Sequence, residues 1–315
     1  MKFNVNFLGR RKIWYIISLL IIIPGIISLF TQGLNAGIDF TGGTLIQVDF
    51  TETVTAGELR TFVDSNVQQN ASIQASGEEN KEYIIRTESL SEEASASLIN
   101  AITQEFGANT ILRNETIGPV IGAELLNNAK WSLILAFLLI MAYISIRFKF
   151  FYAISAIIPL LHDSIIVLSI FSLLQIEVNS SFIAAILTII GYSINSTIVV
   201  FDRIRENTSK GGRGVSLDVI NTSINQTLVR NINTNLAIVF LLLALIILGG
   251  ATTRFFVLAM LMGVIAGAYS SVFIAGSLLY DITDHFDKNK TLTSGKNYKS
   301  NVSKATSKKN TKTAK

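Results

Sequence analysis

The sequence predicts a polytopic α-helical membrane protein with six transmembrane helices and a small α+β domain between the first helix and the second. Half of the 315 residues are hydrophobic and only 15% are charged, so a soluble fold would leave much apolar surface in water. The apolar residues gather in six runs, and the polar, acidic stretch 32–128 separates the first run from the other five. A helix needs about 20 apolar residues to cross a bilayer, and each run reaches that length with its flanks.

The chain begins with a membrane-spanning segment, residues 1–31. Four basic residues precede the apolar run 13–30. A secretory signal peptide has the same beginning, but this run is long for one and no clear small-residue cleavage site follows it. We therefore expect a retained first transmembrane helix with a kink near Pro24 and Gly25.

Residues 32–128 are expected to form a compact soluble domain. Thr55, with Glu58 three residues on, predicts a capped helix start, and Ser91 predicts a second one. Alternating apolar residues in 44–50 predict a half-buried strand. The expected elements are strands 44–50, 71–75, 81–87 and 109–117, helices 55–67 and 91–106, and a turn at 77–80. The order βαββαβ predicts a ferredoxin-like sandwich, with two helices on one face of an antiparallel sheet.

Residues 129–281 carry the other five transmembrane helices. These are expected at 131–146, 150–174, 181–201, 233–248 and 255–280. A cytoplasmic loop, 202–230, connects the fourth to the fifth. The basic tail, 282–315, is expected to be disordered because it has few apolar residues. Contact of this tail with anionic lipid or ribosomal RNA is an alternative, but a solvated tail is the simpler interpretation and no nucleic-acid partner is expected.

The distribution of charge predicts the orientation. Of the 26 Lys and Arg residues, four precede the first span, two lie between spans two and three, five lie in 203–230 and nine lie in the tail. Of the 22 acidic residues, fourteen lie in 32–128. Basic residues stay on the cytoplasmic side, so both termini are expected in the cytoplasm and the domain 32–128 outside it.

The stretch 183–207 is the first candidate for a functional site. It places Ser193, Asn195, Ser196 and Thr197 inside an apolar run. Polar groups at membrane depth are costly unless they face a protein interior or a wet cavity. Hydrogen bonds that only hold helices together are one interpretation. Four polar residues in five positions favour a functional seam between helices.

Asp163 is the second candidate. At 1.5 Å per residue it lies about 20 Å along the third span, near the middle of a hydrocarbon layer of roughly 30 Å. Burying a charged aspartate there costs about 2.5–3.5 kcal/mol. Pro159 loosens the helix one turn before it. A structural aspartate bonded to nearby Ser or Asn is the alternative, and for His162, about 100° around the helix, packing is favoured over a shared site.

Arg230 is the third candidate, at the start of the fifth span. Asn231 and Asn235 follow it one turn apart, on one helix face, where they could bond to Asn195 and Ser196. An anchoring arginine that reaches the lipid headgroups is the alternative for Arg230.

No feature of the sequence supports catalysis, a cofactor or a metal site. The chain has no cysteine, and its two histidines, His162 and His285, have no metal-ligand spacing. The glycine pair in 37–43 lacks the lysine and hydroxyl residue of a phosphate loop, so we expect a tight turn with Asp39 as its cap. The protein is not expected to be an enzyme.

Several motifs together resemble one family. They are Gly-Ile-Asp-Phe-Thr-Gly-Gly at 37–43, Gly-Pro-Val-Ile-Gly at 118–122, His-Asp at 162–163, Gly-Tyr-Ser-Ile-Asn at 191–195, Thr-Ile-Val-Val-Phe-Asp-Arg-Ile-Arg-Glu-Asn at 197–207 and Arg-Asn-Ile-Asn-Thr-Asn at 230–235. In these residues the chain is similar to the SecF side of the SecD/SecF family, of the resistance-nodulation-division superfamily. The resemblance covers about residues 9–281.

This resemblance implies a multi-pass subunit of the bacterial cytoplasmic membrane. It implies a complex with SecD and association with the SecYEG channel, often with YajC and YidC. The complex would use the proton or sodium gradient to promote export of polypeptides. Membrane lipids and the exported polypeptide are the other expected partners, and no cofactor is implied.

One position departs from the family pattern. The residue between Asn195 and Thr197 is usually an aspartate that takes part in ion relay with the arginine matching Arg230. Here it is Ser196, which cannot ionise in the useful range. Either this chain has lost its share of the relay or Asp163 serves instead. The predicted relay and polar seam are therefore Asp163, Asn195, Ser196, Arg230, Asn231 and Asn235.

Two other functions stay open at this stage. A small-molecule or lipid transporter of the same superfamily would be expected to have two halves and paired intramembrane acids, whereas this chain has one half and one central acid. A passive scaffold for the export channel is the second alternative, and Ser196 favours it.

Overall fold

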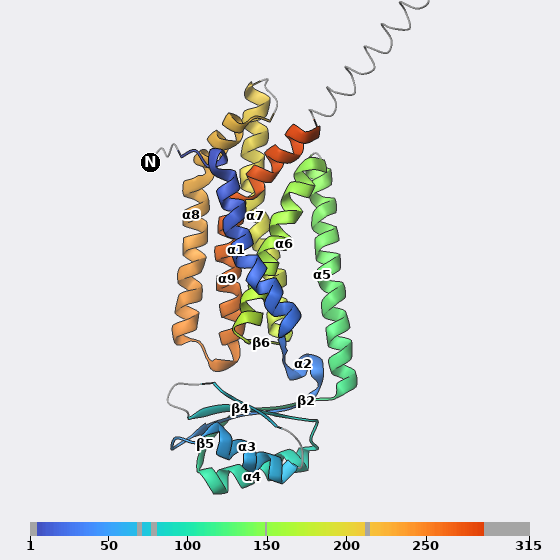
Figure 1. The fold of residues 1–315 in the computed structure, drawn as a ribbon, viewed down its shortest axis with the longest axis vertical. Coiled ribbons are helices and arrows are strands. Elements are labelled where there is room, and N and C mark those ends of the chain that lie inside the picture. Colours follow the sequence, from blue (N-terminus) through green and yellow to red (C-terminus); the bar gives the residue numbers. More distant parts are fainter. Residues whose placement is uncertain (1–4, 68–70, 77–80, 149, 212–214, 287–315) are drawn as a thin grey trace, which may run out of the picture. The chain divides into compact units, whose positions relative to one another are not determined.

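The computed structural model describes residues 5–67, 71–76, 81–148, 150–211 and 215–286 (Figure 1). These residues form two compact units. The helical unit comprises Met1–Ile27, Phe137–Ser169 and Ile186–Lys315, and the sheet unit comprises Ser28–Ala136 and Ile170–Ala185, each considered in its described part. The predicted turn at 77–80 and the predicted tail beyond 286 lie outside the described residues.

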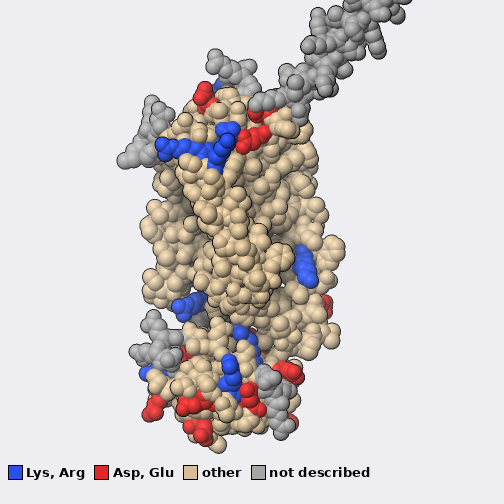
Figure 2. Space-filling view, viewed as in Figure 1, with Lys and Arg blue, Asp and Glu red and all other residues tan. Residues whose placement is uncertain are grey.

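Long helices dominate the chain (Figure 1). They are α1 (Arg11–Thr31), α5 (Pro119–Arg147), α6 (Phe150–Leu173), α7 (Ser180–Gly211), α8 (Leu217–Leu248) and α9 (Ala251–Phe273), with a short 3-10 turn, Leu8–Arg10, before α1 and a further helical stretch at 275–286. Six segments among the described residues are long and apolar enough to cross a membrane. In the view of Figure 2 the flanks of these helices carry few charged side chains. The prediction of a polytopic helical membrane protein is confirmed.

Three predicted boundaries are wrong, each because a helix continues into polar sequence. Helix α5 begins at Pro119, inside the stretch assigned to the soluble domain, and α7 and α8 occupy most of the predicted loop 202–230. Residues 282–286, assigned to the disordered tail, are helical. Apolar content marks where a helix meets lipid, but it does not mark where the backbone stops being helical.

Ion pairs one turn apart explain why α7 continues beyond its apolar part. Arg205 bonds to Asp202 at 2.8 Å, and Glu206 bonds to Arg203 at 2.5 Å and to Lys210 at 2.7 Å. Such pairs stabilise a helix in water without an apolar face.

Helix α1 continues without interruption through Pro24, the position where a kink was predicted.

The sheet unit contains a four-stranded sheet with two helices. Its elements are β2 (Gly43–Phe50), α3 (Ala56–Val67), β3 (Ser72–Ala75), β4 (Glu82–Thr87), α4 (Glu92–Phe106) and β5 (Ala108–Ile117). The strand order is β3-β4-β2-β5, and all neighbouring strands are antiparallel. Apolar residues of β2, β4 and β5 pack with those of α3 and α4 to make the core.

Both predicted helix caps are present. Thr55 and Glu58 bond reciprocally, each backbone N–H to the other's side chain at 3.3 Å, and the Ser91 hydroxyl accepts from the Ala94 N–H at 3.2 Å. The prediction that β2 is half-buried is wrong. It is an inner strand of the sheet, and Leu45 on its second face packs with Ile38 and Ile84 and is also fully buried.

The glycine pair after α1 belongs to a turn that approaches other backbone closely. Gly42 and Gly43 have φ values of 72° and 126°, and a Cβ on Gly43 would lie 2.5 Å from the Thr87 carbonyl oxygen. Only glycine accepts that backbone without strain. The turn includes the short helix α2 (Ile38–Thr41). The prediction that Asp39 caps this turn is wrong. Its carboxylate accepts a hydrogen bond from the N–H of Ser180 at the start of α7, at 2.6 Å.

A buried ion pair joins the four-stranded sheet to a second, two-stranded sheet within the same unit. The second sheet pairs β1 (Asn35–Ala36) with β6 (Glu177–Val178) in parallel. Arg86 of β4 bonds to Glu177 of β6, and only 12% and 2% of their side chains are exposed. Because the two charges are removed from water together, each depends on the other.

We expect Arg86→Met alone to destabilise the sheet unit by about 3–5 kcal/mol, because it leaves the Glu177 charge buried without its partner. The double variant Arg86→Met/Glu177→Leu should recover most of that loss. Thermal unfolding of the detergent-solubilised chain measures both. Equal losses in the single and double variants would contradict this account.

The Thr55–Glu58 cap predicts a pH effect. The hydrogen bond from the Thr55 side chain, and then that from its backbone, lower the pKa of Glu58 from its ordinary value. The stabilisation is therefore complete above the unfolded pKa, about 4.3, and is lost as the pH falls through the folded value. Hydrogen exchange at the first turn of α3 should accelerate over that range in the wild type. In Glu58→Gln, which cannot titrate, it should not, and identical profiles would contradict the prediction.

Candidate functional site

Asp163 lies at the centre of the helical unit. It is 1% exposed, and its carboxylate has partners on three helices. Oδ2 accepts hydrogen bonds from Ser193 of α7 at 2.6 Å and from Ser270 of α9 at 2.7 Å, and Oδ1 lies 2.9 Å from Nδ1 of His162 on α6. The prediction that Asp163 faces a protein interior rather than lipid therefore agrees with its burial.

The surroundings of Asp163 hold little compensating charge. Within the described part of the chain, no Lys or Arg bonds to this carboxylate, and His162 is its only titratable partner. Burying a charge far from water is costly unless hydrogen bonds replace its hydration. Two hydroxyl donors and one imidazole supply that replacement here, and one turn earlier Pro159 leaves the Ser155 carbonyl without its helical donor.

His162 shares the site with Asp163, which corrects the prediction of a packing role. Its Nε2 lies 2.9 Å from the Ser18 hydroxyl of α1, and its ring stacks on Tyr269 of α9 with centroids 6.0 Å apart. Consecutive helical residues point about 100° apart, but both side chains here point inward, toward different neighbouring helices. The long imidazole then reaches back to the carboxylate.

Helices α1 and α6 approach closely enough to bring Ser18 to His162. These two residues are 144 positions apart, and so are Gly25 and Ser169, seven residues further along each helix. The two helices are thus parallel and in register. A Cβ on Gly25 would lie 2.0 Å from Ser169 Cβ and 2.9 Å from its Cα, so glycine is required at this contact.

The other predicted seam residues lie in a second place. Asn195 and Ser196 of α7 and Arg230 and Asn231 of α8 line a small pocket of about 60 Å³. Asn235 is buried next to it and donates to the side-chain oxygen of Asn231 at 2.6 Å. The structure therefore brings together five of the six predicted residues, and Asp163 is not among them.

The predicted bonds of the two asparagines to α7 are wrong. Asn231 donates to Ser271 of α9 at 3.0 Å, and Asn235 donates to Asn231. Ser271 follows Ser270, which bonds to Asp163. The two polar clusters therefore contact consecutive residues of α9. No local pattern in the sequence marks which face of α9 each serine takes.

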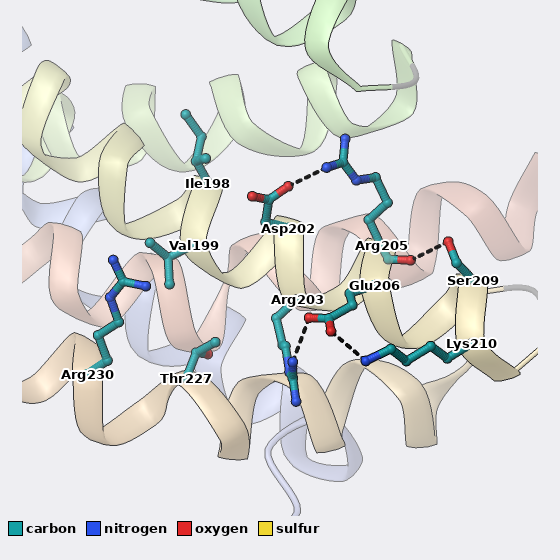
Figure 3. Close-up of a pocket in the computed structure, with 10 residues that line it drawn as sticks. All are labelled: Ile198, Val199, Asp202, Arg203, Arg205, Glu206, Ser209, Lys210, Thr227 and Arg230. Carbon is teal, nitrogen blue, oxygen red and sulfur yellow. Dashed lines mark hydrogen bonds and ion pairs between the residues drawn. The ribbon is translucent and has the colours of Figure 1, made fainter.

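A larger cavity of about 750 Å³ lies beside the small pocket (Figure 3). Residues of α7 line most of it, and Thr227 and Arg230 of α8 complete it. Its lining carries four cationic side chains and two carboxylates: Arg203, Arg205, Lys210, Arg230, Asp202 and Glu206. Figure 3 shows the α7 charges paired with one another. Among the described residues no acid pairs with Arg230, which is exposed and lines both cavities.

Three polar residues near Asp163 escaped the sequence-based prediction: Ser18, Tyr269 and Ser270. Ser18 interrupts an apolar run, which was a usable signal. Ser270 lies on a small-residue face of α9, where a Cβ on Gly267 would lie 3.0 Å from Ser193 Cβ. The same close approach brings Ser193 and Ser270 to one carboxylate.

Comparison with known proteins identifies the family. A sequence model described as protein export membrane protein SecD/SecF, C-terminal, matches residues 98–285, and one described as the SecD/SecF GG motif matches residues 27–54. The protein translocase subunit SecF of Sebaldella termitidis is 39% identical over 285 residues, which cover 88% of this chain and 91% of that protein. The subunit of the same name from Vibrio alginolyticus is 38% identical and covers 87% and 89%.

Solved structures agree. The crystal structure of SecDF, a translocon-associated membrane protein from Thermus thermophilus, matches with a TM-score of 0.83 at 35% identity, covering 89% of this chain and 39% of that one. A SecDF in the super-membrane-facing form matches with a TM-score of 0.69 at 34% identity, covering 93% and 40%. This chain thus spans about two fifths of the SecDF chains.

Six apolar helices with a carboxylate bonded inside their bundle define a multi-pass membrane protein with a polar centre. With the matches above, the chain belongs to the SecD/SecF family, on its SecF side.

The α1–α6 contact yields a prediction. Gly25→Ala should destabilise the chain by about 1–3 kcal/mol, because the added methyl group overlaps Ser169. Gly191→Ala is the matched control, since a Cβ there meets nothing within 4 Å. That change should stabilise α7 by about 0.5–1 kcal/mol. Unfolding midpoints of the two variants in detergent measure the difference, and equal midpoints would contradict the close contact.

Proposed function

We propose that this chain is an accessory subunit of the Sec protein translocase that works with SecD and uses the proton or sodium gradient to promote export. Family membership supports the translocase role, which involves no enzymatic reaction. The match to two fifths of the SecDF chains supports SecD as the partner that supplies the remainder. The observation that carries the gradient-driven part is Asp163, an ionisable group buried in the bundle with a histidine and two hydroxyls bonded to it.

The proposal includes an arrangement in the bacterial cytoplasmic membrane. Both termini lie in the cytoplasm, because most basic residues lie on the same side of the membrane as the termini and basic segments stay on the cytoplasmic side. The domain 32–128, less the first turns of α5, lies outside and handles the emerging polypeptide. Its β-α-β-β-α-β order and its sheet order support a ferredoxin-like fold. The SecYEG channel, YajC and YidC are further proposed partners, carried over from the family.

The proposed ion relay divides between the two polar clusters. Asp163 is the titrating group. The second cluster is polar and contains one cationic side chain, that of Arg230, and no acidic side chain. Its members are Asn195, Ser196, Arg230, Asn231 and Asn235. This follows from Ser196, because a serine cannot ionise in the useful range.

We expect Asp163→Asn, with SecD intact, to abolish the gradient-dependent part of export and to leave the gradient-independent part. Asparagine keeps the size and one acceptor but cannot ionise. Export into inverted membrane vesicles, with and without the gradient, measures the effect. Asp218→Asn, an exposed acid in the first turn of α8, is the matched control.

Two other outcomes would replace this function. Unchanged gradient-dependent export in Asp163→Asn would favour a passive scaffold, with SecD alone carrying ions. Movement of a small solute by the purified protein in vesicles would favour a transporter of the same superfamily.

A further inference from the structure

Asp163 is one end of a continuous chain of hydrogen bonds that ends at the backbone of α1. His162 bridges Asp163 to Ser18, with 2.9 Å on each side. Ser18 Oγ lies 3.3 Å from the Tyr269 hydroxyl, which donates to the Trp14 carbonyl at 2.7 Å. Every residue of this chain belongs to the helical unit.

The donors and acceptors in this chain leave one arrangement of hydrogens. A carbonyl only accepts, so the single hydrogen of the Tyr269 hydroxyl lies toward Trp14. The Ser18–Tyr269 bond is then donated by Ser18. The hydroxyl of Ser18 is thereby used, so the bond between Ser18 and His162 is donated by Nε2 of His162.

The contact between His162 and Asp163 must therefore hold a further proton. With a hydrogen on Nε2, neutral imidazole has a bare Nδ1, which accepts. An ionised carboxylate also only accepts, and two acceptors 2.9 Å apart repel each other. A hydrogen bond at this contact requires one extra proton, on Oδ1 of Asp163 or on Nδ1 of His162. The pair as a whole is then uncharged.

We propose that His162 and Asp163 together bind one exchangeable proton, and that Ser18 and Tyr269 conduct it. This rests on the proposed function, since a gradient must drive the exchange. On unloading, the Nε2 proton passes to Ser18, the Ser18 proton passes to Tyr269, and the Tyr269 proton passes to a water molecule beside Trp14. The shared proton, which lies on Oδ1 of Asp163 in the loaded pair, moves to Nδ1 of His162 and bonds to the Asp163 carboxylate. One proton leaves, and each hydroxyl keeps one.

The exchange changes a contact between helices. Before it, the Tyr269 hydroxyl of α9 donates to the Trp14 carbonyl of α1. After it, the original hydrogen has left, the hydrogen that Tyr269 received from Ser18 points toward Ser18, and the bond to Trp14 is lost. Proton occupancy at Asp163 is thereby linked to the hydrogen bond between α9 and α1. This contact has two states, as ion-driven motion requires.

Other groups around the pair favour this route. Ser193 and Ser270 donate to Oδ2 and keep that oxygen occupied, so Oδ1 is the oxygen that faces His162. Besides Asp163, His162 and Tyr269, no titratable side chain of the described residues bonds within this network. Next to Trp14, Tyr15 donates at 3.0 Å to Asp281, which also pairs with Arg11 at 2.9 Å and whose side chain is 37% exposed, so the far end of the chain lies near a partly exposed ion pair.

The test uses the intact complex with SecD and two conducting variants, Tyr269→Phe and Ser18→Ala. Tyr152→Phe and Ser155→Ala are matched controls, because they remove the hydroxyl groups of a buried tyrosine and a buried serine outside the network. Infrared spectra from about pH 5 to about pH 9 follow the protonated carboxyl band. Gradient-driven export in vesicles is measured alongside.

We expect the wild type to show one titrating carboxyl band that Asp163→Asn removes. Tyr269→Phe, Ser18→Ala and His162→Gln should shift its titration and reduce gradient-driven export, whereas the two controls should match the wild type. If Asp163→Asn abolishes gradient-driven export but the conducting variants behave as the controls do, the relay is overturned and the proposed function stands. If Asp163→Asn leaves export unchanged, the proposed function fails with it. Absence of the band in the wild type overturns the proton site even where a variant does not fold.

Discussion

A carboxylate held in the interior of an apolar bundle constrains the helices around it. Asp163 is only 1% exposed and, among the described residues, has no Lys or Arg bonded to it, so its hydrogen bonds must come from neighbouring groups of the bundle. Those bonds need hydroxyls within about 3 Å. Helices α7 and α9 must therefore approach α6 at defined heights, and α1 must approach His162. The packing of the helical unit can be understood from this requirement.

Small residues make the required distances attainable. In a membrane, lipid is as apolar as leucine, so close van der Waals packing and interhelical bonds hold helices together. Gly263 and Gly267 of α9 lie against Ile189 and Ser193 of α7, four residues apart on each helix. The resulting register places Ser270 beside the carboxylate that Ser193 already contacts. Close packing and the polar site are thus two consequences of one helix contact.

The sequence predicted what depends on local pattern. Apolar runs identified the membrane-spanning helices, and alternation and caps identified the strands and helices of the sheet unit, to within a residue or two at most ends. It failed where a partner is distant. The bond between Ser270 and Asp163 joins residues 107 apart, and that between Ser18 and His162 joins residues 144 apart. Likewise, nothing local shows that Asp39 caps α7 rather than its own turn, or that β2 is covered on both faces.

The division of the predicted seam into two clusters has a mechanical meaning. Helix α7 contributes Ser193 to the carboxylate cluster and Asn195 and Ser196 to the pocket that holds Arg230. Helix α9 contributes Ser270 to the first and Ser271 to the second. Neither helix can rotate or slide without changing bonds in both clusters. A chain with serine at 196 can therefore still link events at Asp163 to the α7–α8 surface around Arg230, because coupling needs a shared rigid element with two arrangements and does not need a charge at every step.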